Sequence, residues 1–159
     1  MEHIIDFWFP NNNFNKFWFD GTVDNYIIKN YKDILENNIT INYKNLSDKM
    51  ILSYIILYDQ FSRNIYRNIN QKDNIKKYDK IALELSEYYF NNRKWLNIST
   101  VHLVFYLMPY RHTFNEKYYN NIMYILNCYE KSNKINNDLL FNKFKKHTLK
   151  NLNLFGNHI

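Results

Sequence analysis

One stretch of the sequence changes character in the middle of what its spacing predicts to be a single helix. The stretch is IILYDQFSRNIYR, residues 55–67, and its apolar first half gives way to side chains that form hydrogen bonds. These side chains belong to Asp59, Gln60, Arg63, Asn64 and Arg67. Asp59 and Arg63 are four residues apart, so they lie on one helix face and can pair. The planar guanidinium groups of arginine suit a carboxylate or a phosphate, so the stretch predicts an anion-binding site.

The same residues also fit a purely structural interpretation. An Asp–Arg pair at this spacing often only braces the end of a helix, and buried polar groups need partners whether or not a ligand binds. Both interpretations stay open. The distribution of arginine favours a site, because only four of the 21 basic residues are arginine and three of them fall in the two polar stretches. The four are Arg63, Arg67, Arg93 and Arg111.

The second polar stretch is YLMPYRHTFNE, residues 106–116. Pro109 is expected to end a helix, because proline pushes the preceding residue out of the helical region. Arg111 and His112 are then expected in a bend, where functional groups are commonly displayed. His112 is the candidate acid or base, since histidine titrates near neutral pH, and Glu116 is close enough to meet it across one turn.

A third candidate is His147, which is in line with Leu140 and Phe144 on the last expected helix. The alternative for His147 is an ordinary hydrogen-bonded histidine in the core. His112, Glu116 and His147 could be assembled into a metal site, but the sequence has neither an HExxH nor a CxxC motif. The chain also has no glycine-rich phosphate loop, so we predict neither a metal nor a cofactor.

The sequence predicts an all-α protein with a single domain over residues 1–159. Apolar residues recur at helical spacing along most of the chain, and two glycines and two prolines are too few for a turn-rich β fold. Short polar connections favour six or seven antiparallel helices, which resemble a tetratricopeptide-like helical repeat although no 34-residue period is found. The predicted starts are Thr22, Ser47, Asp73, Ser99 or Thr100, Asn115, and Asn137 or Asp138, and the second helix extends to about Tyr66.

The charge and the cysteine content limit which partners and which cellular compartment are expected for the protein. The formal net charge is +6, and the densest basic run is Lys143, Lys145, Lys146 and Lys150, which we interpret as a solvated face rather than a nucleic-acid surface. Cys128 is the only cysteine, and the start of the sequence does not resemble a signal peptide. The longest apolar run, residues 50–58, is too short for a membrane span. We therefore expect a soluble cytoplasmic protein in a reducing compartment. Its abundant Asn, Lys, Ile and Tyr indicate an AT-rich genome, such as that of a giant virus or a protist.

Several short blocks in a fixed order resemble the family called domain of unknown function 924. The blocks are IIDFWF at 4–9, WFDGTVD at 18–24, LYDQFSRNIYR at 57–67, FYLMPYRH at 105–112 and KKHTLKNLNLFG at 145–156. The family is mostly bacterial, all-helical and grouped with tetratricopeptide-like folds. The resemblance implies that the polar block, the bend histidine and the late histidine belong to one pattern, and it implies no particular reaction. The residues concerned are Asp59, Gln60, Arg63, Asn64, Arg67, His112 and His147.

The chain departs from the family pattern at three places. Ser62 stands where the family usually has proline, and Thr113 and Phe114 follow the bend histidine where an acidic residue is usual. The family also continues past Phe-Gly into an Arg-Phe-Pro-His-Arg-Asn segment, whereas this sequence has only residues 157–159. We therefore expect a C-terminally short member of the family, with His158 as a candidate replacement for the tail histidine.

The function expected from these observations is that of a binding module or a small-anion-binding protein. Its polar pocket would lie at the end of a buried central helix, and its partner would be a small anionic ligand, a peptide or a protein. The alternative is an enzyme acting on a small phosphorylated or carboxylated substrate, with His112 as the acid or base. RNA binding through the basic run 143–150 is the third interpretation.

Overall fold

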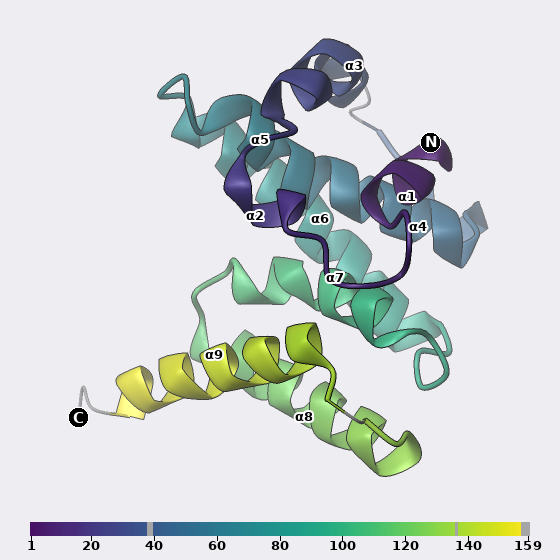
Figure 1. Ribbon diagram of the computed structural model, residues 1–159, viewed down its shortest axis with the longest axis vertical. Helices are drawn as coiled ribbons and strands as arrows, with labels where there is room; N and C mark the ends of the chain where they lie inside the picture. Colours follow the sequence, from purple (N-terminus) through teal and green to yellow (C-terminus); the bar gives the residue numbers. More distant parts are fainter. Residues whose placement is uncertain (38–39, 136, 157–159) are drawn as a thin grey trace.

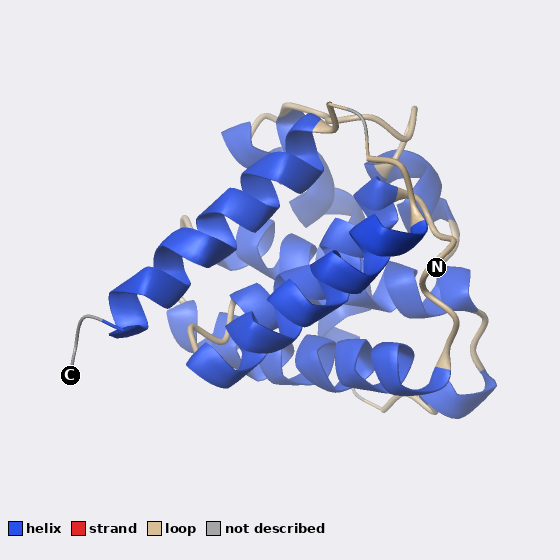
Figure 2. Ribbon diagram, turned by 90° about the horizontal axis from the view of Figure 1, so that it is seen from below, coloured by secondary structure: helices blue, strands red, loops and turns tan. Residues whose placement is uncertain are grey.

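The described residues fold into helices and loops without a β-strand (Figures 1 and 2), which confirms the predicted all-α class. The computed structural model describes residues 1–37, 40–135 and 137–156, so His158 lies outside this part of the chain. The elements are α1 His3–Trp8, α2 Phe17–Asp20, α3 Asp24–Asn37, the 3₁₀ turn η1 Tyr43–Asn45, α4 Asp48–Ile55, the π-helical segment η2 Ile56–Phe61, α5 Ser62–Tyr66, α6 Lys72–Asn92, α7 Thr100–Arg111, α8 Glu116–Ser132 and α9 Leu139–Gly156.

Most of the predicted helix starts are confirmed by side-chain caps. In each case a side-chain oxygen accepts a hydrogen bond from a backbone N–H two or three residues further on, which satisfies a donor that the first helical turn leaves unpaired. These capping residues are Ser47, Ser99, Asn115 and Asp138. The expected cap at Asp73 is wrong, because α6 already begins at Lys72 and Asp73 lies in its first turn.

The prediction that Pro109 ends a helix is also wrong. Pro109 lies inside α7, which continues to Arg111, and the His112 N–H donates to the Met108 carbonyl over 3.0 Å. Proline removes one backbone hydrogen bond and crowds the preceding turn. Helix α7 is apolar and buried on almost every side, so its tertiary packing outweighs this local cost. Arg111 therefore belongs to the last helical turn rather than to a bend.

The segments α4, η2 and α5 form one continuous rod at the centre of the fold. This rod packs against α3, α6 and α7, and α7 in turn contacts α8 and α9. Figure 1 shows α8 and α9 side by side, with the chain running in opposite directions along them. The buried apolar side chains of all these layers join in one cluster, which places the polar end of the central rod next to the end of α7.

The first twenty residues are held on the core by aromatic rings. Trp18 packs edge-on against Phe105 of α7 with 4.8 Å between ring centres, and its indole N–H donates to the Trp8 carbonyl over 2.8 Å. Edge-to-face aromatic pairs of this kind add to the stabilisation from burial alone. They fix the segment that carries Phe14 and Phe19 beside α7 and α9.

The π-helical segment η2 is the main departure of the central rod from the predicted α-helix. A π-helix bonds residue i to i+5 rather than i+4, so carbonyl groups near the change of register lose their usual backbone donor. Two side chains donate to backbone carbonyl groups of this segment. The Ser62 hydroxyl donates to the Tyr58 carbonyl over 2.6 Å, and the Arg63 Nη1 donates to the Asp59 carbonyl over 2.6 Å.

Among the described residues, no helix is both long and apolar enough to cross a membrane.

We expect Ser62→Ala to destabilise the fold more than Ser53→Ala does. Both serines are fully buried and donate to a carbonyl four residues earlier. The Ser62 hydroxyl makes a buried hydrogen bond of 2.6 Å to Tyr58, whereas the bond of 2.9 Å from Ser53 to the Lys49 carbonyl is only partly buried. Removing the hydroxyl from Ser62 should cost about 1 kcal/mol of unfolding free energy, the usual contribution of a buried hydrogen bond, and removing it from Ser53 should cost less. Urea unfolding of the two variants measures the difference, and equal losses would contradict this role for Ser62.

Candidate functional site

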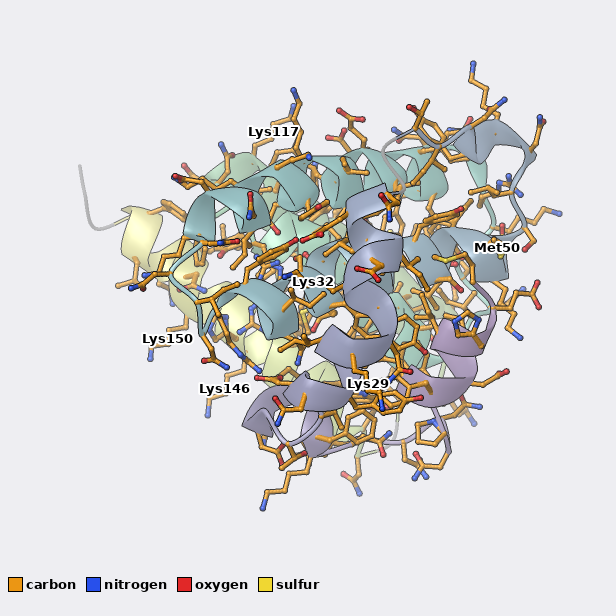
Figure 3. All side chains as sticks on the ribbon, turned by 90° about the horizontal axis from the view of Figure 1, so that it is seen from above. Lys29, Lys32, Met50, Lys117, Lys146 and Lys150 are labelled. Carbon is orange, nitrogen blue, oxygen red and sulfur yellow. The ribbon has the colours of Figure 1, made fainter. Side chains whose placement is uncertain are left out.

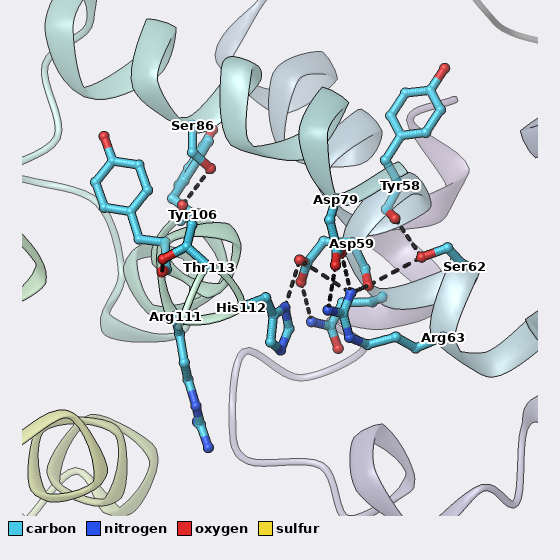
Figure 4. Close-up of polar contacts among 12 residues, drawn as sticks. Tyr58, Asp59, Ser62, Arg63, Asp79, Ser86, Tyr106, Arg111, His112 and Thr113 are labelled. Carbon is cyan, nitrogen blue, oxygen red and sulfur yellow. Dashed lines mark hydrogen bonds and ion pairs between the residues drawn. The ribbon is translucent and has the colours of Figure 1, made fainter. Parts of the chain in front are cut away.

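The site is built around the carboxylate of Asp59, which lies in η2 and is fully buried. His112, at the end of α7, places its Nδ1 2.7 Å from Asp59 Oδ1, and Gln60 donates from Nε2 to Asp59 Oδ2 over 2.6 Å. Arg63 Nη1 lies 3.5 Å from Asp59 Oδ1 (Figure 4). The structure thus brings together two stretches that are about fifty residues apart in the sequence.

The surroundings of Asp59 keep its carboxyl group ionised. Burial by itself raises the pKa, because a charge is poorly solvated inside a protein. The electrostatic interaction and the hydrogen bond with His112 outweigh this effect, with smaller contributions from Arg63 and Gln60, and the pKa of Asp59 falls below its usual value. An ionised carboxylate only accepts hydrogen bonds, so Nδ1 of His112 carries the shared hydrogen. The other ring nitrogen, Nε2, takes no part in the bond to Asp59.

The predicted Asp59–Arg63 pair is present, but Arg63 makes a closer pair with Asp79 of α6. Arg63 Nη1 and Nη2 lie 2.6 and 3.1 Å from the two Asp79 oxygens, which is a bidentate arrangement. Sequence reasoning missed Asp79, because its distance from Arg63 along the chain corresponds to no helical spacing. The guanidinium group of Arg63 therefore links the central rod to α6.

Arg67 and Asn64 also have a carboxylate partner, and it comes from the start of α3. Asp24 accepts from Asn64 Nδ2 over 2.6 Å and from Arg67 Nη2 over 2.9 Å, with Asn68 at 3.3 Å. Gly21 makes the turn before it with φ of 75°, and a Cβ there would lie 3.4 Å from an Asp24 oxygen. Asp24 had no assigned role in the sequence, although it closes the WFDGTVD block of the family resemblance.

Asp59, Asp79 and His112 each bring a potential ligand atom to within 4.8 Å of the others, and this is the metal-like grouping found in the described residues. The Arg63 guanidinium contacts both carboxylates, so a positive charge already occupies the place of a cation. We therefore interpret the group as an ion-pair network. His112 pairs with Asp59 rather than with Glu116, which is exposed at the start of α8.

A polar pocket of about 200 Å³ opens above this network. It is lined by most of the residues that the sequence predicted to bind a ligand, among them the three partners of Asp59, which are Gln60, Arg63 and His112. Trp18, Phe19 and Met108 supply its apolar part. The predicted site residues that line it are Gln60, Arg63, Asn64, Arg67, Arg111 and His112.

Arg111 differs from the other two arginines of the pocket, because its guanidinium group is not paired with a carboxylate of the described residues. Within the described part of the chain, its guanidinium group has no hydrogen bond or ion pair, and its Cζ lies 5.7 Å from the centre of the Phe144 ring. Figure 4 shows its side chain extending away from the Asp59 network toward α9. Partial burial lowers the pKa of Arg111, which Tyr119 and Asp59 oppose. An anion would relieve this uncompensated charge.

His147 lies beside Arg111 in an adjoining pocket of about 280 Å³, together with Lys143. The alternative of a core histidine is wrong, because His147 is exposed on α9. Burial of part of the ring lowers the pKa of His147, and the positive charges of Arg111 and Lys150 lower it further. The lowered pKa favours the uncharged form of His147, so the charges of the same sign beside this pocket are those of Arg111 on α7 and Lys143 on α9.

The basic run on α9 is only partly a free basic surface. Lys146 and Lys150 point outward from the helix (Figure 3). Lys145 instead pairs with Glu130 of α8, with 2.8 Å between Nζ and Oε1. Phe144, the aromatic residue within the run, is buried and cannot offer a face for stacking to a base.

We expect Asp59→Asn to lower the unfolding free energy by about 3 kcal/mol at pH 7, because it leaves charged partners of a buried group unpaired. The folded-state pKa of Asp59 is lowered. Its stabilisation is therefore present above the unfolded pKa of about 3.9 and is lost as the pH falls through the lower native pKa. The difference between wild type and variant should shrink below about pH 4. Urea unfolding from pH 7 to pH 3 measures it.

The matched control is Asp73→Asn, which removes an exposed carboxylate from the first turn of α6. This variant should stay within about 0.5 kcal/mol of wild type across the same pH range. A stability loss in Asp59→Asn that stayed constant down to pH 3 would contradict the ionised, buried state of Asp59.

Comparison with known protein families identifies the family of this chain. A family model described as a bacterial protein of unknown function (DUF924) matches residues 4–158, in agreement with the resemblance seen in the sequence blocks. Neither the curated proteins nor the solved structures contain a match to the chain. The match spans nearly the whole sequence, and the chain therefore belongs to the DUF924 family.

Proposed function

We propose that this protein binds a small monoanion, a carboxylate or a phosphodiester, between the end of α7, the polar end of the central rod and α9. The observation that carries the proposal is the guanidinium group of Arg111, which is partly buried and has no acceptor in the described residues. Arginine in such a position is suited to bidentate contact with a carboxylate or phosphate.

The charges around the pocket support one negative charge on the ligand. Arg63 is balanced by Asp79, Arg67 is balanced by Asp24, and His112 shares a hydrogen with Asp59. Arg111 is left without a counter-charge, and Lys143 and His147 lie near it. A ligand that brings one negative charge would balance Arg111 without disturbing the three pairs.

The pocket also offers further donors for the ligand oxygens. The amide of Gln60 lines it close to Arg111. Arg67 uses Nη2 for Asp24, so its Nη1 keeps hydrogen atoms for a ligand or for solvent. Several donors around one oxygen group are typical of sites that bind carboxylates and phosphates.

We expect Arg111→Gln to abolish anion binding while the protein stays folded. The guanidinium group contacts the Phe144 ring but holds no acceptor in the described residues, so its removal should change the unfolding free energy by less than about 1 kcal/mol. Titration calorimetry and thermal melting with acetate and inorganic phosphate measure binding and stability together.

Lys117→Gln is the matched control, because it removes the same charge from an exposed position at the start of α8. This variant should bind like wild type. Equal binding by wild type and Arg111→Gln, or equal loss in both variants, would overturn the assignment of Arg111.

The Asp59–His112 pair supports a second candidate function, an enzyme with His112 as general base or acid. A buried carboxylate that fixes the Nδ1 hydrogen leaves Nε2 free to take a proton from a bound substrate or from water. Gln60 holds the second Asp59 oxygen, so the orientation of the pair is well defined. Substrates of the same anionic class would place their reacting group near Nε2.

For this second candidate we expect hydrolysis of small phosphorylated or carboxylated esters to disappear in His112→Gln. Wild type, His112→Gln and Lys117→Gln are assayed with p-nitrophenyl phosphate and p-nitrophenyl succinate. The loss of one general acid or base typically lowers the rate by about 100-fold or more. Turnover that survives in His112→Gln would contradict the role of His112 as acid or base. Absence of turnover in wild type would contradict hydrolysis and leave the binding module as the remaining candidate.

Two further interpretations have less support. A tetratricopeptide-like scaffold that takes a peptide or protein partner stays a prediction, as does a cytoplasmic location. RNA binding through α9 is weakened by the Lys145–Glu130 pair and by the burial of Phe144.

A further inference from the structure

We infer that the preferred ligand of this site is an amphiphilic monoanion, in which an apolar group is attached to the carboxylate or phosphodiester. The inference rests on the proposed anion binding at Arg111 and adds the chemistry of the rest of the ligand. It comes from the pocket of about 280 Å³ that adjoins the polar one.

The two pockets share a wall made of Phe19, Met108 and Arg111. An anion held by Arg111 therefore lies at the boundary between them. Ligand pockets in proteins usually have volumes of about 300 to 1,000 Å³ and are mostly apolar, with a few polar groups that fix orientation. Neither pocket reaches this volume alone, whereas a ligand that extends from one pocket into the other can use the volume of both.

The adjoining pocket is apolar inside and basic at its rim. It is lined by the buried Leu140 and Phe144 and by the exposed Phe14 and Phe19, together with the basic side chains of Arg111, Lys143 and His147. No acidic side chain of the described residues lines it. Such a surface attracts an anion and repels a cation. Its apolar side chains offer no hydrogen-bond partners to the polar groups of a sugar or a nucleotide.

The aromatic wall of this pocket is unusually open to solvent. Phe14 is 37 % exposed and Phe19 is 53 % exposed, although Trp18 between them in the sequence is buried. The two rings stack on each other with 6.1 Å between their centres, and Lys143 lies over the Phe14 ring. A ligand chain that covered these rings would remove apolar surface from water, which a small hydrophilic anion would not do.

Acetate, hexanoate and hexanol provide the test, because they separate the charge from the chain. A buried methylene group increases affinity about fourfold, from about 0.8 kcal/mol of transfer free energy. Hexanoate has four methylene groups more than acetate, so we expect it to bind at least about 30-fold more tightly when some of the chain stays exposed. Hexanol lacks the charge and should bind at least about tenfold more weakly than hexanoate. Calorimetric titration of the full chain measures all three.

The double variant Phe14→Ala/Phe19→Ala should lose most of the gain of hexanoate over acetate and keep the affinity for acetate. Phe114→Ala removes a ring that is 70 % exposed and outside both pockets, so it should behave as wild type. Both changes remove exposed side chains, and thermal melting verifies that the variants are folded.

The outcomes separate this inference from the proposed function. If acetate and hexanoate bind equally through Arg111, the amphiphilic ligand is wrong and anion binding stands. If hexanol binds as tightly as hexanoate and Arg111→Gln has no effect, an apolar surface acts alone and the inference is overturned. If no anion binds, both fail. A hexanoate gain that is lost in Phe14→Ala/Phe19→Ala and retained in Phe114→Ala supports the inference.

Discussion

The buried carboxylate of Asp59 is the constraint on which the rest of the site depends. A negative charge inside a protein is costly unless opposite charges and hydrogen-bond donors surround it. Here these come from three elements, through His112 of the α7 terminus, Gln60 of η2 and Arg63 of α5. Each of these partners then has to lie within a few ångströms of one atom group, so Asp59 fixes how the central rod meets α7.

The same constraint spreads outward through the arginines. Arg63 cannot be satisfied by Asp59 alone and takes Asp79 of α6, while Arg67 one turn later takes Asp24 of α3. The polar end of the rod therefore connects four helices by charge-assisted bonds, which are stronger than neutral ones. Brace and site are consequently not exclusive interpretations here, because the residues that brace the rod leave Arg111 and one edge of His112 turned toward the pocket.

Much of the fold follows from local sequence, whereas the site follows only in part. The helix starts at Ser47, Ser99 and Asn115 could be predicted, because a capping side chain bonds to backbone groups only two or three residues away. The grouping of the polar block with His112 was visible only through the family resemblance. Asp24 and Asp79 were out of reach, because tertiary packing alone decides which carboxylate meets an arginine. The prediction that Pro109 ends a helix was wrong, because the burial of α7 overrode the local preference of proline. The sequence also did not predict the π-helical register of η2, whose residues are all buried.

The facing charges on α7 and α9 have a consequence for the motion of the protein. The α8–α9 hairpin joins the rest of the fold mainly through α7, and near Arg111 that boundary sets like charges against each other. When no anion lies between them, like charges oppose close contact between α7 and α9. If an anion binds at Arg111 as proposed, it attracts both sides of this boundary. Anion binding and closure of the hairpin are then thermodynamically linked, and each must strengthen the other by the same free energy.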